Sequence, residues 1–210
     1  QKKRAVLSYG CSSYGYDLRL SSNEFLIFRH VPGTVMNPKN FNPKNLEKTP
    51  LHNDKDGDYF ILPAHSYGLG VALERMRVPE NITVICLGKS TYARLGIIVN
   101  TTPAEAGWEG HLTLEFSNSS GADCRIYANE GICQILFFEG DPCETTYNDR
   151  QGKYQNQLEE VTLAKKEFKL LKLLISKPGK VFTREEILEK VWGSDIIIGD
   201  RTIDVHIRKL

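Results

Sequence analysis

The 210-residue sequence lacks several features that would assign it to a class at once. No apolar run approaches the roughly 18 residues of a membrane-spanning helix. Lys and Arg number 27 against 26 Asp and Glu, so no excess of one charge marks a protein that coats nucleic acid. An apolar fraction of 40% is enough for a sizeable core and excludes a disordered chain, a coiled coil or a collagen-like fibre.

Cysteine is also scarce. The five cysteines are scattered through the first 143 residues: Cys11, Cys86, Cys124, Cys133 and Cys143. An odd, scattered set is not the disulfide framework of a secreted domain, so a reducing compartment is favoured. We therefore expect a cytoplasmic protein whose cysteines are small apolar core residues.

The residues that are present divide the chain into two unlike parts. Residues 1–157 contain all nine Tyr and 14 of the 17 Gly. Short alternating or β-branched stretches recur there between turn clusters, which predicts strands. The expected strands are 59–62, 67–73, 82–87, 95–100, 111–116, 124–128 and 133–138. This pattern is typical of a β-sandwich or barrel, and the amphipathic helices that an α/β fold would need are not apparent.

From Leu158 onward the apolar spacing is helical. The residues that carry this spacing in the first expected helix are Phe168, Leu171, Leu174 and Ile175. Thr183 and Glu186 have the spacing of a capping box. The helix that follows should bury Ile187, Leu188, Val191 and Trp192, and a third helix is expected from about Asp200. We therefore place a domain boundary near residue 158, between 1–157 and 158–210.

The densest group of chemically active residues is the stretch 88–96. It combines two glycines, a lysine, two hydroxyls and an arginine directly after an apolar strand. Such residues can offer backbone amides, hydroxyl donors and cations to a polyphosphate. The glycine spacing of a Walker loop is missing. By itself, this motif is equally compatible with a turn that carries surface charges.

Glu115 stands out in the expected strand 111–116. Leu112, Leu114 and Phe116 alternate toward one face, so Glu115 shares the other face with Thr113 and Ser117. A lone carboxylate on a strand is usually solvated. It becomes a candidate general base only if other polar groups converge on it.

Several separated motifs in 1–157 resemble the dCTP deaminase family. They are Ser8–Gly10, Ser13–Asp17, Lys89–Arg94, Gly107–Gly110, Thr113–Phe116, Tyr127–Gly131 leading to Gln134, and Gly152–Gln157. The resemblance implies a mainly β fold of the dUTPase-like type, a distorted barrel or roll that forms homotrimers with active sites between subunits. It also implies zinc-independent hydrolysis of dCTP to dUTP and ammonia in pyrimidine deoxynucleotide metabolism.

The resemblance assigns a role to each matching position. Glu115 matches the catalytic carboxylate that activates water for attack at C4 of cytosine and then protonates the leaving ammonia. Ser90 and Arg94 match residues that organise the water, the base and that carboxylate. The implied substrate-binding residues are Lys89, Ser90, Thr91 and Arg94 near phosphate, Glu105, Thr113, Leu114 and Gln134 near sugar and base, and Tyr147, Lys153 and Gln157 in a segment that closes on the triphosphate. Mg²⁺ is expected to arrive with the triphosphate, not on protein side chains.

Other pyrimidine chemistry leaves different signatures. Zinc-dependent deaminases combine His-x-Glu with Pro-Cys-x-x-Cys, and this chain has Pro142-Cys143 with Thr146 in place of the second cysteine. A dUTPase loop with an Asp-x-x-Tyr-Arg-Gly-like segment is replaced by 105–110. A dUTPase, or a bifunctional enzyme that continues to dUMP, remains the alternative activity.

Residues 158–210 resemble the winged-helix effector domain of two-component response regulators. The matching stretches are 167–171, 178–185, 191–193 and 200–210, and the last looks like a recognition helix. Its candidate DNA-contacting residues are Arg201, Asp204, Val205, His206, Arg208 and Lys209. Because the sequence ends at that helix, we expect a partial domain without its β-hairpin wing. With 11 basic and 9 acidic residues, this part has only a small positive net charge with which to attract DNA. A DNA-binding regulator is the competing function.

Overall fold

The computed structural model describes residues 5–29, 31–33, 35–39, 41–158, 173 and 180–192. The chain forms two compact units, Gln1–Val161 and Thr162–Leu210, which we call the first and second unit. No helix among the described residues has the length and apolar character needed to cross a membrane.

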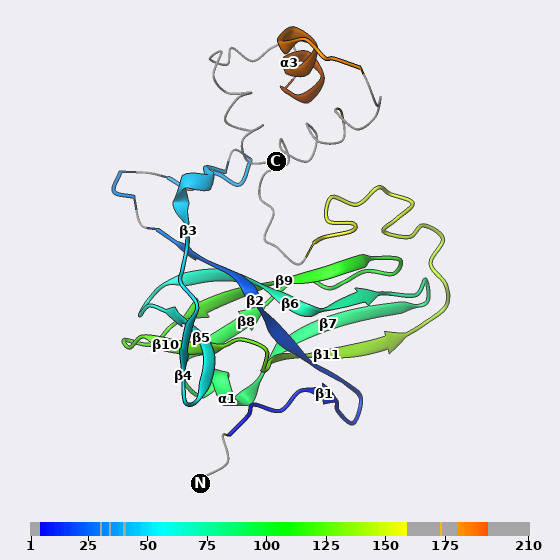
Figure 1. Ribbon diagram of the computed structural model, residues 1–210. Coiled ribbons are helices and arrows are strands. Elements are labelled where there is room, and N and C mark those ends of the chain that lie inside the picture. Colours follow the sequence, from blue (N-terminus) through cyan, green and yellow to red (C-terminus); the bar gives the residue numbers. More distant parts are fainter. Residues whose placement is uncertain are drawn as a thin grey trace. The chain divides into compact units, whose positions relative to one another are not determined.

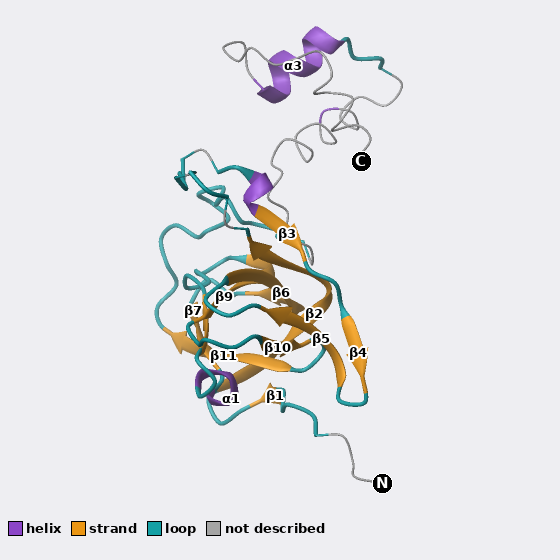
Figure 2. Ribbon diagram, turned by 90° about the vertical axis from the view of Figure 1, so that its left-hand side faces the viewer, coloured by secondary structure: helices purple, strands orange, loops and turns teal. Residues whose placement is uncertain are grey.

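The first unit is mainly β, which confirms the predicted fold class (Figures 1 and 2). Its strands are β1 (Gly10–Cys11), β2 (Gly15–Phe28), β3 (Leu46–Lys48), β4 (His52–Asp54), β5 (Gly57–Leu62), β6 (Tyr67–Arg77), β7 (Ile82–Gly88), β8 (Ile97–Asn100), β9 (Glu109–Asn118), β10 (Cys124–Tyr127) and β11 (Gly131–Glu139). Its described helices are a 3-10 turn, η1 (Pro43–Asn45), and a single turn, α1 (Ser90–Ala93).

Two antiparallel sheets make up this unit. The larger has the order β7-β11-β2-β6-β9-β8, with β1 and β3 added to β2, and the smaller has the order β10-β5-β4. The two edge strands of the larger sheet, β7 and β8, lie in contact. A Cβ atom on Gly88, at the end of β7, would lie only 3.6 Å from the Val99 backbone nitrogen on β8. The sheet therefore curls into a nearly closed barrel (Figure 1).

The core follows from strand alternation, because every second side chain points into the barrel. Phe25 packs on Phe60 with ring centroids 5.3 Å apart and on Phe116 with centroids 5.1 Å apart. All three rings are fully buried. Burying one such side chain stabilises the fold by about 1.5–3 kcal/mol.

All seven expected strands are present, with ends shifted by a few residues, whereas four strands were missed: the short β1, β3 and β4, and the long β2. This long strand pairs with β11 and β6 and so lies at the centre of the larger sheet. Its register against β6 shifts between Leu20 and Phe25. The polar residues 21–24 occupy this irregularity, and they interrupt the apolar alternation by which a strand is recognised.

The cysteine expectation holds in part. All five are free, and Cys86 and Cys133 are buried in the core. Cys11 and Cys143 are exposed, so the expectation is wrong for them. Cys11 lies on the two-residue strand β1 and Cys143 in the segment after β11, and neither belongs to the hydrophobic core cluster.

In the second unit the structure describes the helix α3 (Arg184–Trp192). The expected capping box is present: the Glu186 amide donates to Thr183 Oγ1 at 3.2 Å, and the Thr183 amide donates to a Glu186 carboxylate oxygen at 3.0 Å. Ile187 and Val191 are buried, as the helical spacing predicts. Four predictions lie outside the described residues: the first expected helix with Phe168, Leu171, Leu174 and Ile175, the Trp192 side chain, the expected third helix, and all six candidate DNA-contacting residues.

Candidate active site

Glu115 lies on β9 with its side chain half-buried. Thr113 and Ser117 share its face and exposure, while Leu114 and Phe116 between them are fully buried on the core side. The strand therefore presents the polar face that its alternation predicts. Leu114, an expected substrate-binding residue, can offer a ligand only its backbone because its side chain fills the core.

The neighbouring strand β6 supplies a phenol to Glu115. The Tyr67 phenol lies close enough to the Glu115 carboxylate to act on it as a hydrogen-bond donor, which lowers the pKa of Glu115. Burial acts in the opposite direction and is larger, so the pKa of Glu115 is raised overall. Burial, followed by the charge and the hydrogen bond of Glu115, raises the pKa of Tyr67 to about 12. Tyr67 is not indicated by the sequence pattern, because only the β6–β9 register brings it to Glu115.

Lys89 and Gln134 converge on a carboxylate that sequence analysis did not select. The Lys89 ammonium forms an ion pair with Asp17, and Gln134 Nε2 donates to Asp17 Oδ1 at 3.0 Å. The side chains of Lys89 and Asp17 are 14% and 13% exposed. This cluster joins β2, β11 and the residue after β7. Asp17 lies in a motif that resembles the family, but its pairing depends on contacts between residues 72 and 117 positions apart.

Three expected site residues, Ser90, Thr91 and Arg94, are exposed in or directly after α1. The buried Tyr92 anchors this turn, since its phenol oxygen accepts a hydrogen bond of 2.9 Å from the Tyr127 amide. Burial raises the pKa of Tyr92, so the phenol stays neutral.

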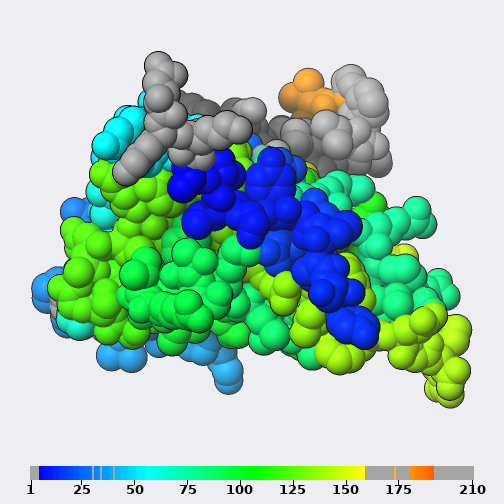
Figure 3. All heavy atoms as spheres, turned by 90° about the horizontal axis from the view of Figure 1, so that it is seen from below, coloured from blue at the N-terminus to red at the C-terminus, as the bar shows by residue number. Residues whose placement is uncertain are grey.

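The blue N-terminal segment, the green region that includes α1 and the yellow-green region of β11 meet on one face of the molecule (Figure 3).

A segment far along the chain is joined to β9 beside Thr113. Gln157 hydrogen-bonds through its side chain to Thr113 Oγ1, and its carbonyl accepts from the His111 amide at 2.9 Å. Gly110 makes this approach possible: its φ is +147°, and a Cβ there would lie 2.7 Å from the Gln157 nitrogen. The segment therefore reaches the face that carries Glu115.

The residues before Gln157 are also held closely. Trp108 is buried, and its Nε1 donates to the Tyr154 carbonyl at 2.9 Å. The Tyr154 amide donates to the Tyr147 phenol at 2.9 Å, and the Tyr147 ring occupies the space that a side chain on Gly152 would need. Lys153 is exposed, with its ammonium 4.9 Å from the Tyr154 ring centre. Tyr147 and Lys153 thus lie in one ordered turn.

Glu105 has a partner from the same region, since its exposed carboxylate forms an ion pair with Arg150. Because both side chains are about half exposed, this pair can exchange with a ligand at low cost.

The expected catalytic residues Glu115, Ser90 and Arg94 do not lie together in space within one chain. β8 pairs with β9 so that Ile97 faces Asn118 and Asn100 faces Glu115. Arg94 precedes Ile97, so it lies beyond the opposite end of β8 from Glu115, and three residues of strand separate the two ends by about 10 Å. Within the described ranges, no recorded hydrogen bond or ion pair joins Glu115 to Ser90 or Arg94.

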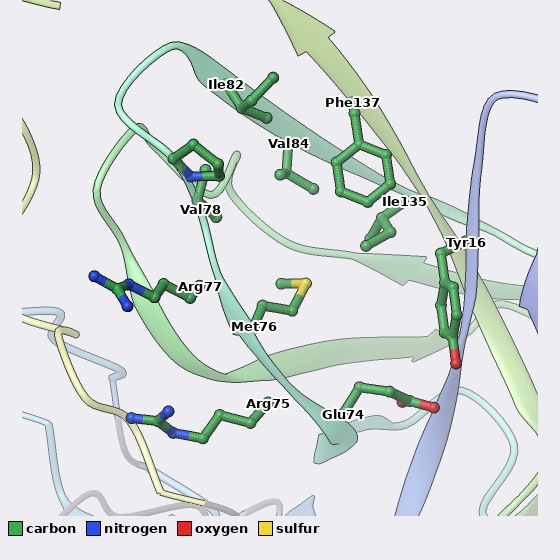
Figure 4. Close-up of a pocket in the computed structure, with 11 residues that line it drawn as sticks. Tyr16, Glu74, Arg75, Met76, Arg77, Val78, Ile82, Val84, Ile135 and Phe137 are labelled. Carbon is green, nitrogen blue, oxygen red and sulfur yellow. The ribbon is translucent and has the colours of Figure 1, made fainter.

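An apolar cavity of about 280 Å³ lies elsewhere in the first unit, between β6, β7 and β11. Met76, Val84 and Ile135 turn toward one another in it, and the guanidinium of Arg77 extends away (Figure 4). None of the residues expected to bind substrate lines this cavity. Its apolar lining does not suit a triphosphate.

Metal-binding capacity depends on how the donor side chains are grouped. Among the described residues, no group of three or more His, Cys, Asp or Glu side chains is placed to hold a metal ion. The donors near the expected phosphate residues are instead cations and hydroxyls, which suit an anion.

Comparisons with known proteins find family matches for both parts of the chain. Residues 5–140 match the family described as dCTP deaminase-like, and residues 158–210 match the family described as transcriptional regulatory protein, C terminal. The chain is 54% identical over 164 residues to the dCTP deaminase of Campylobacter curvus (strain 525.92), covering 78% of this chain and 84% of that protein. It is 51% identical over 158 residues to the dCTP deaminase of Acidobacterium capsulatum, covering 75% and 82%. A solved 2'-deoxycytidine 5'-triphosphate deaminase from Agrobacterium tumefaciens matches with a TM-score of 0.45 and 17% identity, covering 67% of this chain and 43% of that one.

Proposed function

Because the chain belongs to the dCTP deaminase family, we propose that its first unit hydrolyses dCTP to dUTP and ammonia. The main support from the site is the half-buried carboxylate of Glu115. It lies on the polar face of β9, beside the segment that Gln157 joins to that strand. We place the enzyme in the cytoplasm and in deoxynucleotide metabolism, which the scattered free cysteines and the substrate support.

Glu115 acts as the general base and then as the general acid. Its carboxylate takes a proton from water, and the resulting hydroxide equivalent attacks C4 of cytosine. The amino nitrogen receives a proton, the C4–N bond breaks and ammonia leaves, with the carbonyl oxygen of uracil in its place. A half-buried carboxylate with a raised pKa suits both directions of proton transfer near neutral pH.

The exposed residues of α1 organise the reactants. Arg94 stabilises the ionised carboxylate and the charge that develops at C4, and Ser90 positions the water. Lys89 and Thr91 contact phosphate, and Gln134 and Glu105 contact the nucleoside. Lys153 adds an exposed cation, and the segment that contains Tyr147 and Gln157 closes over the triphosphate.

Mg²⁺ fits this site as an ion carried by the substrate. The described residues offer no carboxylate or imidazole cage for it, whereas triphosphate oxygens are its preferred ligands. When bound, the ion neutralises part of the triphosphate charge. Zinc-independent chemistry is supported by the absence of the zinc deaminase motif from the sequence.

A homotrimer with shared sites is the assembly that we propose. The separation of Arg94 from Glu115 along β8 supports it, because a neighbouring copy can bring its α1 turn to the Glu115 face. Mixing two inactive variants, Glu115→Gln and Arg94→Gln, tests this arrangement. If sites are shared, random mixed trimers recover about a quarter of the wild-type activity. Sites contained in one chain would recover none.

The activity itself is tested by incubating the purified chain with dCTP and Mg²⁺ and measuring ammonia, dUTP and pyrophosphate. We expect ammonia and dUTP in equal amounts from the wild type, and neither from Glu115→Gln. Pyrophosphate release from dUTP without ammonia from dCTP would replace the proposal with a dUTPase. Ammonia together with pyrophosphate would identify a bifunctional enzyme.

A second activity is supported by the match of residues 158–210 to the C-terminal region of transcriptional regulators. With the domain boundary near residue 158, we propose this part as a DNA-binding candidate. A gel-shift titration of the full chain against tandem-repeat promoter DNA and random duplex tests it. Equal retardation of both duplexes would exclude sequence-specific binding.

A further inference from the structure

We propose that Tyr67 is a positioning residue that orients the Glu115 carboxylate and keeps it ionised for proton abstraction; this inference rests on the proposed function. Tyr67 acts through Glu115 and has no contact with substrate in this role. It deepens the mechanism by naming what controls the base within the same chain.

The strand register brings the two side chains together. β6 and β9 are antiparallel, with Tyr67 opposite Ser117 and Leu69 opposite Glu115. Tyr67 and Leu69 are two residues apart, so their side chains share a face. Tyr67 is thus the diagonal neighbour of Glu115, at a distance that a long aromatic side chain can span, and its hydroxyl is close enough to influence the pKa of the carboxylate.

The Tyr67 ring is held by other aromatic rings. Its centroid lies 5.0 Å from that of Phe28, in an edge-to-face contact at 72°. Phe28 in turn contacts Phe41, with centroids 6.0 Å apart. A donor fixed by such packing loses little conformational entropy when it binds, so it holds the carboxylate in one orientation.

Within its own chain, the surroundings of Glu115 leave control of its charge to this phenol. The residues directly opposite it are Leu69 on β6 and Asn100 on β8, and its neighbours on the same face of β9 are Thr113 and Ser117. None of these titrates near neutral pH. Within the part of the chain that the structure describes, Tyr67 is the titratable side chain recorded as interacting with Glu115.

The direction of the effect follows from the electrostatics. Burial raises the pKa of Glu115, and the Tyr67 hydrogen bond opposes that rise. Tyr67 itself has a pKa of about 12, so it remains a protonated donor across the working range. Since the base must be ionised to accept a proton from water, Tyr67 extends activity toward lower pH.

The test compares the pH profile of kcat for wild type and Tyr67→Phe, which keeps the packed ring and removes the hydroxyl. We expect the acidic limb of the variant to move to higher pH. On that limb it should lose about tenfold in kcat, against a loss of a few fold on the plateau. A parallel titration by NMR with ¹³C-labelled glutamate, with the Glu115 signal assigned through Glu115→Gln, should show Glu115 protonating at higher pH in Tyr67→Phe.

Tyr59→Phe is the matched control, because Tyr59 is a buried tyrosine on β5 in the other sheet. It should change neither the profile nor the titration. An unchanged acidic limb and an unchanged Glu115 titration in a folded Tyr67→Phe protein would overturn the inference. A wild type that releases no ammonia from dCTP would overturn the proposed function instead, and the NMR titration would still decide on the interaction.

Discussion

Two carboxylates of the first unit differ in the partners that their own chain supplies. Asp17 forms an ion pair with Lys89 and accepts a hydrogen bond from Gln134, so its partners come from the same chain. Glu115 is half-buried, and the side chain that acts on it within the described part of the chain is the neutral phenol of Tyr67. The ion pair gives Asp17 a structural role, whereas Glu115 is not tied to a cation of its own chain and is placed to exchange a proton with water.

The largest expected effect comes from Glu115→Gln. The amide cannot accept a proton from water, so kcat should fall by about 10²–10⁴. Because the substitution is isosteric, dCTP binding measured by calorimetry should be retained. If dCTP binding were lost together with kcat, Glu115 would have a structural role like that of Asp17, and the two carboxylates would not differ in function.

Asp17→Asn should act mainly on stability. It leaves the largely buried Lys89 ammonium without its counter-charge, which costs about 3 kcal/mol in the free energy of unfolding measured in urea. The double variant Asp17→Asn/Lys89→Met removes the stranded cation, so it should recover part of this loss. If the double variant were no more stable than the single one, the ion pair would not be the source of the cost.

Gln157→Ala should have a smaller, local effect. It removes the hydrogen bond to Thr113, which contributes about 1 kcal/mol to docking of the segment 152–157. Hydrogen exchange in that segment should quicken about fivefold, and KM for dCTP should rise with little change in kcat. Gln151→Ala, at an exposed position, is the control and should leave both unchanged.

The smallest effect on the site is expected from Thr183→Ala in the second unit. Loss of the N-cap should destabilise α3 by about 1 kcal/mol, seen in the thermal unfolding of the full chain. Deamination should not change, because the cap is outside the first unit. Glu189→Ala, on the exposed side of the same helix, serves as control. If kcat fell in Thr183→Ala but not in Glu189→Ala, the stability of α3 would be coupled to the activity of the first unit.

Several features were predictable because they depend on short-range patterns. The alternation of Leu112, Leu114 and Phe116 indicated the face of Glu115, and the Thr183–Glu186 spacing indicated the start of α3. By contrast, β2 was missed, since its polar irregularity breaks the same alternation on which the other strand predictions depended.

The sequence by itself determined the mainly β class, the polar strand face of Glu115 and the family of the first unit. The tertiary structure decided the pairing of Asp17 with Lys89 and of Tyr67 with Glu115. These contacts join residues about 50 to 70 positions apart through strand register, and register is set by the packing of the whole sheet. A local pattern contains no information about which strand lies beside another, so these partners become visible only in the fold.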